Sequence, residues 1–160
     1  MTAGIAESAP LHKTDDAFWQ AHFDINVTAP FRLCRAALPL LEAAPRGRIV
    51  NVASTAALAG APYIAAYAAS KHALLGLTRV LALELRDIAV HSVCPGFVDS
   101  PLTDRSVENI VKLTGRDAAD AREALAQQNP SGRLIKPDEV AAKVLELIEC
   151  DGTGQEVVID

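Results

Sequence analysis

Residues 49–78 read IVNVASTAALAGAPYIAAYAASKHALLGLT, and this stretch decides the fold. It opens with a short apolar run that ends at Ser54, crosses a loop of small residues, and continues into a segment that carries Tyr67 and Lys71. A short apolar run bounded by small residues predicts a buried strand, and the longer segment after it predicts a helix. The chain therefore places a hydroxyl at a strand end close to a Tyr and a Lys on the next helix.

The spacing of Tyr67 and Lys71 suggests proton-transfer chemistry. Residues four apart lie on one face of a helix. An ammonium group beside a phenol stabilises the phenolate, so we expect a lowered pKa for Tyr67. A phenol tuned in this way serves as a general acid or base near neutral pH, and Ser54 is placed to bond the same substrate oxygen. The alternative is a chance pair on a structural helix. Tyr63 offers no such pair, because four residues after it comes Tyr67.

The stretch resembles the short-chain dehydrogenase/reductase family in several positions. The family's N-x-x-S strand end corresponds to Asn51 and Ser54, and its Y-x-x-x-K motif with Ser before the Lys corresponds to Tyr67, Ser70 and Lys71. The thirteen-residue offset from Ser54 to Tyr67 also matches. The resemblance implies an α/β fold: a partial Rossmann-like, doubly wound parallel sheet of about three strands with flanking helices. It also implies catalytic roles for Ser54, Tyr67 and Lys71.

Asn26 is the fourth catalytic residue that the resemblance implies. It lies in the run DINVTAPF, four residues before Pro30 and inside a predicted helix. Asn is a poor residue for a helix interior. The simple interpretation is a polar residue that faces solvent. In the family, an Asn in this context lies at a helix distortion and holds a water that links the catalytic Lys to solvent, and the close local match favours this second interpretation.

Two further segments resemble the family's cofactor contacts, with NAD or NADP as the implied cofactor. The opening MTAGI resembles the tail of the N-N-A-G motif, although Met1 and Thr2 replace both Asn residues. The run PGFVDS follows a second apolar strand and resembles the segment that passes the nicotinamide, where Ser100 would bond the carboxamide. Tyr67 and Lys71 would contact the nicotinamide ribose. The remaining implied cofactor contacts are Ala3, Gly4, Pro95, Gly96 and Val98.

The order of elements follows from apolar runs, capping residues and prolines. We expect strands near 47–53, 88–94 and 156–160, with the first strand exposing an apolar edge. We expect helices over about 14–44, 62–86 and 137–150, the first bent or interrupted by Pro30 and Pro39. The family's substrate lid corresponds to about 101–131, with helical stretches near 104–113 and 117–128.

The two long helices predict association between copies of the chain. The helix over 62–86 is apolar around most of its circumference, which requires two buried faces. One face packs on the sheet, and the other meets a second subunit. In the family this helix and the preceding one build a four-helix interface. We therefore expect a homo-oligomer that associates through helices about 14–44 and 62–86.

Composition narrows the class of protein. The chain has 160 residues and a net charge of −5, and it carries no basic stripe, which argues against nucleic-acid binding. We see no apolar run long enough to span a membrane and no signal peptide. Three distant cysteines indicate reduced thiols in a cytoplasmic protein. The four histidines have no paired ligand spacing, so we expect no metal. The implied substrate is a small carbonyl compound or alcohol.

The family's glycine-rich T-G-x-x-x-G-x-G loop, which binds the cofactor pyrophosphate, has no counterpart in the 160 residues. We therefore interpret residues 1–160 as a single partial NAD(P)-binding domain, its catalytic half, and expect weak dinucleotide binding. The favoured function is carbonyl/hydroxyl interconversion, with a 3-oxoacyl-thioester reductase or 3-hydroxyacyl dehydrogenase as the nearest types. A non-catalytic remnant or association partner stays open, as does an epimerase or dehydratase. A glycine-rich segment encoded upstream of Met1 would mean a misplaced start.

Overall fold

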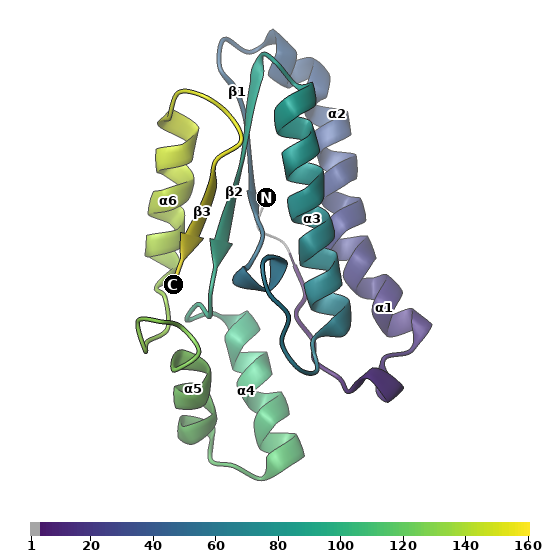
Figure 1. Ribbon diagram of the computed structural model, residues 1–160, viewed down its shortest axis with the longest axis vertical. Helices are drawn as coiled ribbons and strands as arrows, with labels where there is room; N and C mark the ends of the chain where they lie inside the picture. Colours follow the sequence, from purple (N-terminus) through teal and green to yellow (C-terminus); the bar gives the residue numbers. More distant parts are fainter. Residues whose placement is uncertain (1–3) are drawn as a thin grey trace.

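The computed structural model describes residues 4–160, which form a three-stranded parallel sheet with helices on both faces (Figure 1). The strands are β1 (Gly47–Val52), β2 (Ile88–Pro95) and β3 (Glu156–Ile159), in the order β1-β2-β3. The register pairs Gly47 with Ile88 and Ser92 with Glu156. The α/β class, the parallel sheet and the three strands are confirmed.

Alternate residues of the strands bury against different helices. Ile49 belongs to a core cluster with helices α2 (Ala29–Ala43) and α3 (Ala65–Glu84), which lie side by side on one face of the sheet (Figure 1). Val50 packs with Leu147 of α6 (Pro137–Glu149) on the opposite face. Because both faces of β1 and β2 are covered, these two strands are mostly buried, as is typical of parallel sheets, whereas the edge strand β3 alternates between exposed and half-buried residues.

The predicted helix over 14–44 consists of three segments. Helix α1 (Asp16–Phe23) passes into a π-helical turn, η2 (Asp24–Thr28), and then into α2. Pro30 lies in the first turn of α2 and has no N–H for the carbonyl four residues earlier, that of Asn26. The distortion expected at Pro30 is therefore present as a widened turn just before it. Pro39 lies inside α2, which continues past it, so of the bend or interruption expected there the interruption is absent.

A side-chain cap fixes the start of α1. The side chain of Asp15, not the hydroxyl of Thr14, caps the helix by accepting a hydrogen bond from the Phe18 N–H at 2.8 Å. The Thr14 hydroxyl donates to the Pro10 carbonyl at 3.2 Å instead, after the short 3-10 turn η1 (Leu11–Lys13). Both side chains are short oxygen acceptors suited to capping, so sequence alone does not decide between the two neighbours.

Helix α3 begins three residues later than expected. Tyr63 has a φ of 69°, the only positive φ among the non-glycine residues that the structure describes. A left-handed residue cannot continue into a helix, and α3 therefore starts at Ala65 rather than near residue 62. The loop between Ser54 and Tyr63 contains the 3-10 turn η3 (Thr55–Ala57).

Two helices extend beyond the carboxyl ends of the strands (Figure 1). They are α4 (Pro101–Thr114) and α5 (Ala118–Ala126), close to the expected stretches of the segment 101–131. A left-handed Gly115 ends α4. The two helices share a small apolar cluster formed by Val107, Ala121 and Leu125. They therefore form one unit above the sheet edge where ligands bind in open α/β folds.

Two expectations concern the surface. Within the described part of the chain, β1 pairs with β2 alone, so the open strand edge is confirmed. None of the helices in residues 4–160 is sufficiently long and apolar to traverse a membrane.

Candidate functional site

Lys71 is a buried cation on the face of α3 that points to the sheet. Lys71 is 6 % exposed, and its Nζ donates a hydrogen bond to the Val52 carbonyl at 3.1 Å. The same Nζ lies 5.8 Å from the centroid of the Tyr67 ring. The i, i+4 spacing therefore brings the two side chains together as predicted, with the ammonium group facing the ring.

Burial controls the protonation of both groups. It lowers the pKa of Lys71 to about 8, because a buried ammonium loses its hydration. Burial also raises the pKa of Tyr67, and a hydrogen bond with Ser54 acts in the opposite direction. The lowered pKa expected for Tyr67 was wrong, since the lost hydration of the phenolate outweighs the stabilising contacts.

Ser54 joins this pair from the end of β1. Its backbone is fully extended, with a φ of −177°, and its Oγ accepts a hydrogen bond from the Ala56 N–H at 3.1 Å. The side chain therefore caps η3 while staying within bonding reach of the Tyr67 phenol. Ser54 is placed in this way because β1 ends at Val52 and the chain turns into η3 directly after Ser54.

Asn26 is fully buried in the π-helical turn η2, and its side chain bonds several groups around the site. Its Nδ2 donates to the Ile5 carbonyl and to the Ser70 hydroxyl, both at 2.9 Å. Its Oδ1 accepts from the Ile5 N–H at 3.0 Å. The Ser70 hydroxyl then donates to the Tyr67 carbonyl at 2.7 Å. These bonds rule out the simple interpretation of Asn26 as a solvent-facing residue.

Gly4 lies against Asn26 and Lys71. A Cβ added at Gly4 would stand 3.2 Å from Asn26 Oδ1 and 3.7 Å from Lys71 Nζ. The segment after Gly4 thus runs along the site, as the sequence predicts. Ala3, the other residue predicted there, lies outside the described residues.

The second predicted group lies at the end of the neighbouring strand. Pro95 ends β2, and Gly96 donates its N–H to the Ile159 carbonyl at 2.8 Å. Val98 forms an isolated parallel bridge with Ile135. Ser100 sits immediately before α4 and makes no capping hydrogen bond with its side chain. Parallel strands end at one edge of a sheet, so this group and Ser54 share that edge.

Part of this arrangement fits a nicotinamide dinucleotide. The gap at Gly4, which a Cβ would fill, lies beside the buried Lys71, and the loop after β2 offers backbone groups at the same sheet edge. A pyrophosphate requires a cluster of glycine N–H groups at a helix start. The 160 residues contain no such cluster. The residues present therefore fit the nicotinamide end of the cofactor and do not fit its pyrophosphate.

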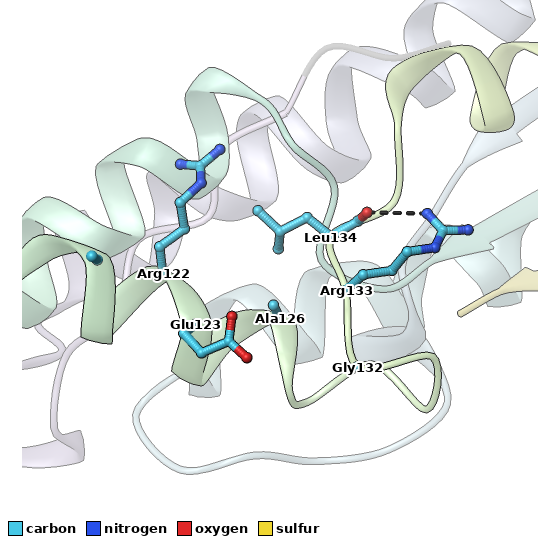
Figure 2. Close-up of a pocket in the computed structure, with 7 residues that line it drawn as sticks. Arg122, Glu123, Ala126, Gly132, Arg133 and Leu134 are labelled. Atoms are coloured by element: carbon cyan, nitrogen blue, oxygen red, sulfur yellow. Dashed lines mark hydrogen bonds between the residues drawn. The ribbon is translucent and has the colours of Figure 1, made fainter.

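Hollows also lie elsewhere on the surface of residues 4–160. One of about 310 Å³ lies between α5 and residues 132–134 (Figure 2). Arg122 and Glu123 line it from the helix, and Leu134 lines it from the loop. Another, of about 380 Å³, lies between α3 and the segment that leads into β3. Neither is lined by a predicted site residue. The described residues also hold no group of three or more metal-ligating side chains.

Sequence reasoning missed two buried polar residues next to the predicted loop. Asn129 is 4 % exposed and bonds both backbone groups of Phe97. Thr103 is 5 % exposed, and its hydroxyl donates to the Val98 carbonyl at 2.5 Å. The only available signal for Asn129 was its place before Pro130 in the run NPSGR, which indicates a turn.

Comparison with known proteins identifies the family. The short chain dehydrogenase family matches residues 1–110, and the chain belongs to this family. It is 38 % identical to the D-beta-hydroxybutyrate dehydrogenase of Cupriavidus necator over 88 % of this chain and 55 % of that protein. It is 34 % identical to the 3-oxoacyl-[acyl-carrier-protein] reductase FabG of Thermotoga maritima over 99 % of this chain and 62 % of that protein.

A solved structure gives the same answer for the fold. The crystal structure of an F189W actinorhodin polyketide ketoreductase with NADPH superposes on the chain with a TM-score of 0.91 at 33 % identity. That match covers 99 % of this chain and 63 % of the ketoreductase. The chain therefore spans roughly half to two thirds of the length of the relatives it matches.

Proposed function

We propose that the chain carries the proton-transfer and nicotinamide-binding half of an oxidoreductase that interconverts small carbonyl compounds and alcohols with NAD or NADP. The observation that carries the proposal is the buried Lys71, whose Nζ lies 5.8 Å from the centroid of the Tyr67 ring. On this proposal residues 1–160 are one catalytic half-domain, with about 101–131 as the substrate lid.

Each site residue has a distinct part in the proposed reaction. Tyr67 gives a proton to the substrate oxygen, or accepts one from it, through its phenol. Ser54 bonds the same oxygen and fixes its position. Lys71, with a pKa of about 8, carries a positive charge at neutral pH that stabilises the phenolate and bonds the nicotinamide ribose. Asn26 holds the path by which protons reach Lys71. The bound cofactor would supply or accept the hydride.

Names of relatives guide the proposed substrate class. Two of them act on 3-oxoacyl or 3-hydroxy compounds by name. The lid between β2 and α6 is the segment most free to vary, since loops beyond strand ends carry specificity on a fixed scaffold. We propose a 3-oxoacyl thioester, or the corresponding 3-hydroxy compound, as the substrate.

Turnover of acetoacetyl-CoA with NADPH and with NADH tests this function directly. Replacing Tyr67 by Phe removes only the reacting hydroxyl, and we expect it to lower turnover by at least about 100-fold. Tyr63→Phe is the matched control, because Tyr63 lies four residues earlier and is 66 % exposed. We expect turnover within about twofold of wild type for that control. Equal activity of the Tyr67→Phe variant would remove Tyr67 from the mechanism.

A second candidate is a non-catalytic chain that associates with copies of itself or with relatives. Large apolar side chains stay uncovered on α2 and α3: Leu33 is 58 % exposed, Leu40 77 % and Leu83 85 %. We propose that these two helices bury that surface in a homo-oligomer, which sedimentation velocity measures. Complete absence of turnover in wild type with either nucleotide favours this candidate. Three free cysteines fit a reducing, cytoplasmic location, which we also propose.

A further inference from the structure

The loop after β2 is fixed by side chains from other elements. The Phe97 N–H donates to Asn129 Oδ1 at 2.8 Å. The Phe97 carbonyl accepts from Asn129 Nδ2 and from the Ile135 N–H, both at 2.9 Å. A single buried amide thus bonds both backbone groups of one loop residue, as a neighbouring strand would.

Asn129 also fixes its own segment. Its Nδ2 donates a second hydrogen bond to the Arg133 carbonyl at 2.7 Å. This arrangement uses one acceptor and two donors of one side chain. Aspartate would keep only the acceptor, and leucine would keep neither. The geometry therefore specifies an amide of this length.

Gly96 leaves the space that Asn129 occupies. A Cβ at Gly96 would stand 2.2 Å from Asn129 Oδ1, a distance that real Cβ atoms do not adopt. It would also stand 3.1 Å from Asn129 Cγ, whereas the nearest atom of another residue, Ile135 Cδ1, would be at an ordinary 3.5 Å. The absence of a side chain at Gly96 is thus explained by Asn129 alone.

Asn129 lies three residues after α5, the second lid helix. Arg122 of α5 bonds Asp104 of α4 at 2.6 Å and also pairs with Asp99, which directly follows the loop. The lid and the loop after β2 are therefore connected at two points, one charged and exposed, the other amide-based and buried.

We propose that Asn129 is a positioning residue that fixes the backbone of 96–98 against the end of the lid, so that the loop presents one conformation to the nicotinamide. This inference rests on the proposed function for its nicotinamide part. Asn129 touches neither substrate nor cofactor and acts through Phe97.

Amide hydrogen exchange in the absence of nucleotide tests the fixing of the loop. In Asn129→Ala we expect exchange at Phe97 to accelerate at least about tenfold, while amides of β2 keep their protection. Asn129→Asp retains the acceptor, so exchange at Phe97 should lie between wild type and Asn129→Ala. Asn109→Ala is the control, because Asn109 lies on the lid and bonds Ser8, away from the loop. Unchanged exchange at Phe97 in Asn129→Ala overturns the inference.

A double substitution separates direct contact from general loss of stability. Gly96→Ala alone should accelerate exchange at Phe97, because its Cβ displaces the Asn129 amide. Added to Asn129→Ala, the same substitution should have no further effect. Additive effects contradict the inference. If Asn129→Ala also accelerates exchange at the amides of β2, then exchange at Phe97 in Asn129→Asp and Gly96→Ala decides whether Asn129 fixes the loop.

Titration with reduced nicotinamide mononucleotide tests the functional part. We expect Asn129→Ala to weaken binding about five- to tenfold and Asn109→Ala to leave it unchanged. Equal affinity of wild type and Asn129→Ala, together with faster exchange, contradicts the nicotinamide part. Wild type that binds no nucleotide contradicts the proposed function, and the exchange data then decide by themselves whether Asn129 fixes the loop.

Discussion

At the scale of single residues, the site depends on a cation that is costly to bury. Lys71 has its Nζ on the Val52 carbonyl and over the Tyr67 ring, with no carboxylate within bonding distance in the described part of the chain. Because its pKa is lowered to about 8 in the folded chain, keeping Lys71 protonated there lowers the free energy of unfolding. Such a cost without a structural gain is typical of functional sites.

Stability measurements on Lys71→Met test this cost. In the wild type, the unfolded chain holds the Lys71 proton up to about pH 10.5 and the folded chain only up to about 8. Stability from this group is therefore gained as pH rises through that window and lost as pH falls through it. Relative to Lys71→Met, we expect the wild type to gain at most about 3 kcal/mol of unfolding free energy across the window.

Urea unfolding at several pH values gives this difference, and the other titrating groups cancel because both proteins carry them. If the difference in unfolding free energy between the wild type and Lys71→Met stays constant across this pH window, the charge on Lys71 does not destabilise the folded protein.

At the scale of elements, the π-helical turn η2 is the feature that turns Asn26 inward. A regular helix through Pro30 would leave the Asn26 carbonyl without its donor. The widened turn lies directly before Pro30, and the Asn26 side chain bonds the segment at Ile5 and the α3 residue Ser70. The residue in the distorted turn thus joins the segment at Ile5, the first long helix and α3.

Asn26→Ala tests whether this connection contributes to the fold. The substitution leaves both backbone groups of Ile5 without their partner, and we expect a loss of about 1–3 kcal/mol of unfolding free energy. The matched control is Asn109→Ala, which removes a half-buried amide on the lid and should cost less than about 1 kcal/mol. Thermal and urea unfolding measure both. Equal losses in the two variants would mean that Asn26 has no special structural part.

Sequence patterns predicted the helices and strands better than the segments that connect them. Strand positions followed from short apolar runs, and α6 followed from Pro137 with two acidic residues after it. The left-handed Tyr63 was not predictable, because its conformation depends on a bond between its carbonyl and the Ala9 N–H at 2.8 Å, which no local rule specifies. Phe97, whose two backbone groups Asn129 bonds, lies 32 positions away in the chain, and this contact was equally hidden.

The same division holds for the site. The spacing of Tyr67 and Lys71 predicted their proximity, since helix geometry is local. The direction of the Tyr67 pKa was mispredicted, because burial depends on how the loop 55–64 and the segment after Gly4 pack over the helix. Local patterns place side chains on a face, and only the assembled structure determines their hydration.

At the scale of the whole molecule, the chain combines a well-formed candidate site with an uncovered strand edge. Residues of η2, α3 and the end of β1 form the candidate site, and the loop after β2 lies at the same sheet edge. The other side of β1 carries no strand in residues 4–160. An open edge of this kind invites pairing with another chain, and the glycine loop that would bind a pyrophosphate has no counterpart in the sequence.

Titration of the wild-type chain with reduced nicotinamide mononucleotide and with NADH tests whether the chain binds only the nicotinamide end of the cofactor. A chain that holds the nicotinamide end and lacks the pyrophosphate loop gains little from the adenosine half of NADH. We expect both ligands to bind, with NADH at most about tenfold tighter, a difference of about 1.4 kcal/mol. NADH binding at micromolar concentration and about 100-fold tighter than the mononucleotide, or no binding of either ligand, would contradict this expectation.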